Sequence, residues 1–157
     1  MMRFDTFLPA VLERARREAS AAGSSTVEAH HLLLAVAAGD EPSTRELLAS
    51  VGLDHAATRT ALQREFQHSL AAAGVSVDLA GMPRPDHGRT GSPPLGSSVK
   101  LALGRGLATV SRKQNLRPAH LLLGILQAPV GTVPRALALA GIDRAALVQR
   151  IRQSLAA

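Results

Sequence analysis

The chain has 157 residues, 46% of them hydrophobic and 19% charged, so it can bury one core and is not disordered by composition. It contains no cysteine, tryptophan or tyrosine, which excludes disulfides, thiolate metal sites and cysteine nucleophiles and disfavours base-stacking surfaces. The net charge of +6 is uneven, because residues 1–67 carry −2, residues 68–94 carry zero and residues 95–157 carry +8. This asymmetry predicts that the second half faces an acidic partner or nucleic acid; the alternative is a solvated basic face that keeps the chain soluble.

The composition predicts helices throughout, since alanine and leucine make up a third of the chain. Apolar residues recur on one helical face from Phe4 to Ala22. Residues 73–94 are rich in glycine, proline and serine and predict a linker. The predicted helices of the first half span residues 4–22, 27–38, 43–51 and 54–72, and those of the second half span residues 97–112, 116–127, 132–140 and 143–156.

The two halves are copies of one unit. At an offset of 89 residues, residues 7–66 and 96–155 share 13 identities without a gap. Gly52 and Gly141 both fall where a left-handed residue would end the third helix. Residues suited to accept from free N–H groups coincide at the predicted helix starts: Thr26 with Asn115, Ser43 with Thr132, and Asp54 with Asp143.

These observations predict an all-α fold of two pseudo-symmetric four-helix repeats, residues 4–72 and 95–156. About 60 residues of short helices bury too little surface to be stable alone, so both repeats should pack into one globule. A cytoplasmic location is expected, because Arg3 and Asp5 interrupt any signal-peptide core. The longest uncharged stretch, residues 118–134, is too short to cross a membrane.

The histidines predict no metal site. His30 and His31 are adjacent and point about 100° apart on a helix, so they do not grip one ion as an i,i+4 pair would. His31 and His120 are expected to be structural residues in the first turn of the second and sixth helices. No Ser-His-Asp arrangement is indicated, and we expect no catalytic residue and no cofactor.

The repeated motif resembles a known family. His31-Leu32-Leu33-Leu34 and His120-Leu121-Leu122-Leu123 each open a second helix, and Arg3-Phe4 precedes the first. This pattern resembles the N-terminal (Clp repeat) domain of the Clp ATPases of the ClpA/ClpC type. The resemblance implies an eight-helix docking module for adaptors and substrates. No phosphate-binding G-x-x-x-x-G-K-[ST] sequence is present, so we expect a stand-alone N-domain without the AAA+ motor and without enzymatic activity.

The resemblance also suggests ligand positions. N-domains of the ClpC type bind phosphorylated arginine in two pockets, each with a threonine at the start of the first helix and a glutamate before the motif histidine. Here Asp5 stands at the threonine position and His30 at the glutamate position of the first copy, and Ala119 replaces the glutamate of the second. Glu28, with Asp5, could substitute in part at the first pocket, because a guanidinium is held by carboxylates.

Five basic residues form a candidate patch for an acidic or phosphorylated peptide: Lys100, Arg105, Arg112, Lys113 and Arg117. The alternative for Arg112 and Lys113 is a structural one, because cations are favoured at a helix C-terminus. The expected function is a non-enzymatic module that binds or sequesters adaptors, substrates or ligands of a Clp ATPase N-domain. The alternative function is nucleic-acid or acidic-partner binding through the second repeat. Nucleic acid is less favoured because stacking residues are missing, and no membrane partner is expected.

Overall fold

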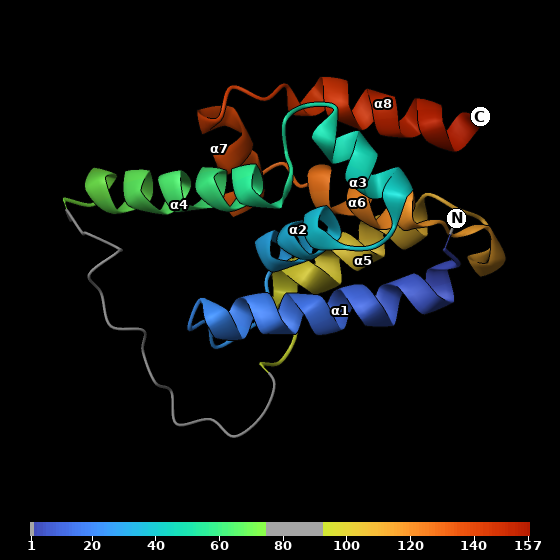
Figure 1. Cartoon of the computed structure of the whole chain (residues 1–157), viewed down its shortest axis with the longest axis horizontal. Helices are drawn as coiled ribbons and strands as arrows, with labels where there is room; N and C mark the ends of the chain where they lie inside the picture. The colour runs from blue at the N-terminus through green and yellow to red at the C-terminus, as the bar shows by residue number, and fades with distance from the viewer. Residues whose placement is uncertain (1, 75–92) are drawn as a thin grey trace.

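A computed structural model describes residues 2–74 and 93–157, which form eight α-helices and one short 3-10 turn (Figure 1). The all-α prediction is confirmed. Most of the predicted linker, residues 75–92, lies outside the described residues. In chain order the elements are α1 (Phe4–Ala21), α2 (Ala29–Ala38), α3 (Pro42–Ala49), α4 (His55–Ala72), α5 (Ser97–Ala108), η2 (Lys113–Asn115), α6 (Pro118–Leu126), α7 (Thr132–Leu139) and α8 (Arg144–Ala156).

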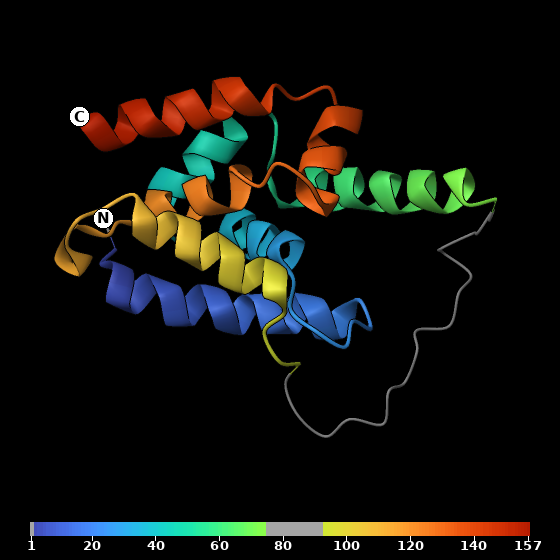
Figure 2. The ribbon, with the colours of Figure 1, turned by 180° about the vertical axis from the view of Figure 1, so that it is seen from behind.

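Helices α2 and α6 form the centre of the fold. Every residue of α6 is buried, and so are eight of the ten residues of α2. A helix that is apolar on all sides belongs in the middle of a core. Helices α1 and α5 lie on one side of this pair and α4, α7 and α8 on the other, as Figures 1 and 2 show from opposite directions.

The two repeats interlock. Helix α4 of the first repeat packs against α7 of the second, and α8 of the second packs against α3 of the first. One cluster of buried apolar side chains runs through both repeats, from Phe7 on α1 to Ile151 on α8. Each repeat thus completes the core of the other.

Two pairs of predicted helix-end residues are confirmed. The Asp54 and Asp143 carboxylates accept from the N–H groups of Ala57 (2.7 Å) and Ala146 (3.0 Å), which is N-cap geometry. Gly52 and Gly141 have φ of +78° and +72°, the left-handed conformation that favours glycine after a helix.

The other four predicted N-caps are wrong. Thr26, Ser43, Asn115 and Thr132 are not the residues that precede their helices; Glu28, Glu41, Arg117 and Gly131 are. Proline explains two of the shifts, because Pro42 and Pro118 occupy the first helical position, where the missing N–H costs nothing. Glu41 does cap α3 through its side chain, which accepts from the Ser43 N–H.

The gap-free register of the repeats fails in the first helix of each. The buried alanines of α1, Ala15 and Ala19, would fall at offset 89 on Gly104 and Ala108, which are exposed. An offset of 87 instead of 89 places Ala15 on Ala102, which is fully buried, and Ala19 on Gly106, which is also buried. The connection after α5, residues 109–117, is therefore two residues longer than residues 22–28 after α1.

Candidate functional site

The motif histidines hold the helix starts around which the candidate site is built. His31 Nδ1 accepts from the Glu28 N–H at 2.9 Å, and His120 Nδ1 accepts from the Arg117 N–H at 2.9 Å. Burial lowers the pKa of both histidines, that of His31 to about 4, with His30 adding to the effect. The neutral ring that accepts at Nδ1 is thus the favoured form. Both residues are structural, as the sequence predicted.

A hollow of about 520 Å³ lies between the start of α1 and the α5–α6 connection, and we call it the N-terminal hollow. It brings together Asp5 from the first repeat and Lys113 and Arg117 from the second, three residues that the sequence had singled out. Its complete lining is Met2, Arg3, Phe4, Asp5, Lys113, Gln114, Leu116 and Arg117. The α5–α6 connection supplies one wall of the hollow.

Positive charge dominates this hollow. The Asp5 carboxylate lies 3.7 Å from the Arg3 guanidinium, and both side chains are exposed. The Arg117 guanidinium donates to the backbone oxygen of Leu155 at the end of α8. Lys113 is exposed, and its ammonium group makes no hydrogen bond or ion pair within the described residues. With three cations and one carboxylate, the hollow suits an acidic group, because opposite charges attract.

Glu28 lies in the joint between the repeats and not in the hollow. Its carboxylate accepts from the hydroxyls of Thr26, at 3.0 Å, and Ser98. Ser98 Oγ in turn accepts from the Ala29 N–H at 2.8 Å. A parallel bridge between Val27 and Leu95 runs beside these contacts. Glu28 thus connects the N-termini of α2 and α5.

His30 lies against the ring of His31, with centroids 4.1 Å apart, and away from the hollow lining. Burial lowers the pKa of His30, and the nearby charges of Glu28 and Glu65 act in the opposite direction. Glu65 is buried and receives hydrogen bonds from Ser69 (2.6 Å) and Arg135 (2.9 Å). Burial raises the pKa of Glu65, but these two bonds, together with the nearby charges of Arg135 and His30, outweigh it and the net pKa is lowered.

Three arginines of the second repeat, Arg105, Arg117 and Arg144, bind backbone oxygens, a role that the sequence alone did not indicate. Arg105 Nε donates to the Gly124 oxygen at 2.8 Å and Arg144 to the Leu126 oxygen at 2.7 Å, both in the last turn of α6. Cations at a helix C-terminus satisfy its free carbonyls and oppose its dipole. Five of the nine basic side chains in residues 95–157 are bonded in the fold: Arg105, Arg117, Arg135, Arg144 and Arg150.

The remaining members of the predicted patch are exposed. Lys100 lies on the outer side of α5, and Arg112 and Lys113 lie in the connection that follows. The alternative that placed Arg112 and Lys113 at the C-terminus of the fifth helix is wrong, because α5 ends at Ala108. The patch therefore divides into structural arginines and free cations.

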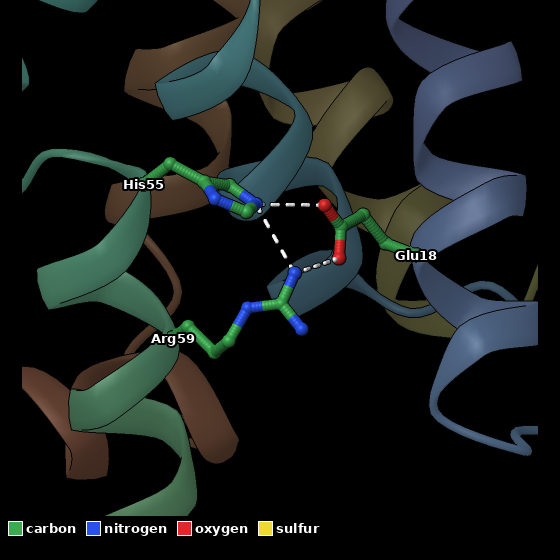
Figure 3. A network of polar contacts seen from close by, with 3 residues as sticks. All are labelled: Glu18, His55 and Arg59. Carbon is green, nitrogen blue, oxygen red and sulfur yellow. Dashed lines mark hydrogen bonds and ion pairs between the residues drawn. The ribbon is translucent and has the colours of Figure 1, made fainter.

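A polar cluster joins α1 to α4 (Figure 3). Glu18 Oε1 lies 2.8 Å from His55 Nε2, and Glu18 Oε2 lies 3.1 Å from the Arg59 guanidinium. His55 and Arg59 are one turn apart on α4 and approach the carboxylate from the same side. Sequence spacing shows the His55–Arg59 pair but not the carboxylate from a distant helix.

Within residues 2–74 and 93–157, no three histidine, aspartate or glutamate side chains gather in a way that would hold a metal ion. Among the helices of the same ranges, none combines the length and apolar character needed to span a bilayer.

The sequence matches the family model of the Clp repeat (R) N-terminal domain over residues 3–81, half of the chain, and the chain belongs to this family. Its fold is similar to the crystal structure of the N-terminal domain of the caseinolytic protease associated chaperone ClpD from Arabidopsis thaliana. That likeness has a TM-score of 0.62 and 19% sequence identity, and it covers 93% of this chain and 92% of the other. No curated protein matches the sequence. The predicted family resemblance is confirmed.

Proposed function

We propose that this chain is a non-enzymatic protein-binding module of the Clp protease system, which binds or sequesters adaptors, substrates or other ligands of a Clp ATPase N-domain. Membership of the Clp repeat N-terminal domain family is the observation that carries this proposal. The 157 residues contain no phosphate-binding G-x-x-x-x-G-K-[ST] sequence, which supports a role in binding rather than in ATP hydrolysis.

The N-terminal hollow is the contact we assign to an acidic or phosphorylated segment of the partner. Arg3, Lys113 and Arg117 line it, and of their three cationic groups the Lys113 ammonium is the one that has no bond within the described part of the chain. A free ammonium group on a hollow is available to a carboxylate or phosphate without first breaking a contact in the fold.

The test is a degradation reaction with a ClpA/ClpC-type ATPase, its protease, an adaptor and a substrate that requires the adaptor. Excess purified chain should slow this reaction, because it competes for the adaptor, and should leave an adaptor-independent substrate unaffected. Lys113→Glu should restore the rate at least in part. Arg64→Glu is the matched control, since Arg64 is an exposed cation on α4, which extends away from the hollow (Figure 1).

Unchanged degradation of both substrates at excess chain would contradict the proposed function. Equal effects of Lys113→Glu and Arg64→Glu would contradict the assignment of the hollow, because a general change of charge would then account for the result.

A further inference from the structure

The outer face of α5 differs from that of its counterpart α1. In the corrected register, Leu101, Gly104, Leu107 and Ala108 occupy the places of Arg14, Arg17, Ser20 and Ala21 on α1. The first repeat thus presents two arginines and a serine where the second presents two leucines and a glycine. The fold itself therefore does not require apolar residues at these positions of α5.

These four residues form what we call the α5 outer face. Leu101 is 61% exposed and Leu107 is 42% exposed, which places them among the four exposed large apolar side chains of the described residues. The inner side of α5 packs against α6 through Val99, Ala102 and Gly106, and Figure 2 shows no other helix in front of α5. Contiguous exposed apolar residues on one helix face are typical of an interaction surface.

Gly104 shapes this face for another helix. A Cβ added at Gly104 would meet no atom within 4 Å, so the glycine leaves a notch between Leu101 and Leu107 that nothing fills. Small residues let two helix axes approach closely. On the inner side of α5, Gly106 allows such a close approach to α6, because a Cβ at this position would lie 2.8 Å from the His120 backbone oxygen.

The charge around the face specifies the partner. Lys100 lies on the same side of α5, and Arg112 and Lys113 follow its C-terminal end. All three are exposed, and their charged side chains make no bond in the described residues. From residue 95 to 142 the sequence contains no acidic residue. A second copy docked here would bring these cations against their equivalents, and like charges across an interface are unfavourable.

We infer that the α5 outer face binds an amphipathic helix of a partner protein, with its apolar stripe on Leu101, Gly104, Leu107 and Ala108 and acidic residues facing Lys100, Arg112 and Lys113. In recognition of this kind the partner helix makes contact through side chains at i, i+3, i+4 and i+7. The inference rests on the proposed function and adds the surface and the chemistry of the partner segment.

The test measures binding of fluorescent peptides of about 18 residues, long enough to form several helical turns, to the purified chain. The first peptide has a leucine stripe flanked by glutamates. The second replaces the glutamates with lysines, and the third scrambles the first so that no stripe remains. We expect the first peptide to bind at least about tenfold more tightly than the other two, with an affinity that falls as salt rises.

Matched variants locate the site. Leu101→Glu and, separately, Leu107→Glu should each weaken the first peptide by about tenfold or more, because each puts a carboxylate into the apolar contact. Phe66→Glu on α4 is the control, since Phe66 is also apolar and 48% exposed. Circular dichroism and the thermal midpoint verify that each variant is folded, which is expected because these side chains lie outside the core.

Two outcomes would overturn the inference: equal binding of the acidic and scrambled peptides, or equal losses in Phe66→Glu and Leu101→Glu. A concentration-dependent dimer that Leu101→Glu abolishes would also overturn it, because the occupant would then be a second copy. The degradation assay separates the two proposals. Inhibition without peptide binding removes only this inference, and peptide binding without inhibition removes only the proposed function.

Discussion

Gly124 of α6 lies directly against Ala102 of α5, so closely that a Cβ added to Gly124 would overlap the Ala102 backbone oxygen. The Gly106 nitrogen, one turn further along α5, would lie 2.9 Å from the same Cβ. The contact is therefore one of backbone against backbone. It makes α5 and α6 the most tightly joined pair of helices in the second repeat.

Gly124→Ala should strongly destabilise the protein, because neither backbone yields without moving a helix. We expect a loss of about 1–3 kcal/mol or more in the free energy of unfolding, the range for overpacking a close contact. Gly104→Ala is the matched control in the open, and it should raise the free energy of unfolding by about 0.5–1 kcal/mol through helix propensity. Urea unfolding followed by circular dichroism measures both. A Gly124→Ala protein as stable as the wild type would refute the packing.

Glu28→Ala should destabilise the protein by about 1–3 kcal/mol, because it leaves the hydroxyls of Thr26 and Ser98 without their acceptor. Ser98→Ala should cost less, and the two effects should be non-additive by about 0.5 kcal/mol or more, since the side chains are in contact. Glu13→Ala, an exposed carboxylate on α1, is the control and should change stability little. Strict additivity in the double-mutant cycle would remove Glu28 from the joint.

The free energy of unfolding should fall as the pH decreases from about 6.5 to about 4, because His31 stays neutral in the folded protein over this range. Its pKa is about 4 in the folded protein against an ordinary 6.5, so between these values the unfolded chain binds a proton that the folded protein does not. The stabilisation is fully present above pH 6.5 and is lost as pH falls toward 4. It amounts to about 3 kcal/mol at most.

His31→Gln provides the test, because a glutamine at the third helical position also accepts from the N-cap N–H but does not titrate. The variant should keep most of the stability at pH 7.5 and show a shallower loss between pH 6.5 and 4. His30 and His120 remain in the variant and contribute loss in the same direction, so the comparison rests on the difference between the two profiles. Identical profiles would show that the protonation of His31 contributes nothing to the loss of stability at low pH.

Arg144→Ala should destabilise the protein by about 1 kcal/mol, because it frees the Leu126 oxygen at the end of α6. Arg152→Ala is the control, since the Arg152 side chain is exposed and makes no bond with the described residues. Thermal unfolding of the two variants compares a structural arginine with a free one. Equal midpoints would contradict the C-terminal role of Arg144.

The sequence was sufficient for the helices because their signals are local. The eight predicted helices agree with the structure to within four residues at each end, and the aspartate caps and the φ-positive glycines are where short-range rules place them. The end of α5 shows the limit. Predicted at 112, it lies at Ala108, because a polar connection with a 3-10 turn follows, and residues 109–112 carry no strong helix breaker.

The candidate site was less accessible because its contacts join distant segments. Asp5 and Lys113 line one hollow although more than a hundred positions separate them, and Glu28 binds Ser98 from the other repeat. The sequence places Arg105 in the candidate patch and gives Arg144 no role beyond its charge, whereas both donate to carbonyl oxygens whose positions depend on where α6 ends in space. Only tertiary packing decides which cations are free, so net charge alone overstated the surface available to a partner.

Competition for an adaptor tests most directly whether the chain binds the ligands of a Clp ATPase N-domain. A labelled adaptor is bound to the full-length ClpA/ClpC-type ATPase, a much larger particle than this chain, and the unlabelled chain is added while the fall in fluorescence anisotropy is recorded. The account predicts that the chain displaces the N-domain with a saturable dependence on concentration, and that Lys113→Glu displaces it less well than Arg64→Glu does. An unchanged anisotropy at large excess of the chain, with every adaptor of the ATPase, would contradict the account.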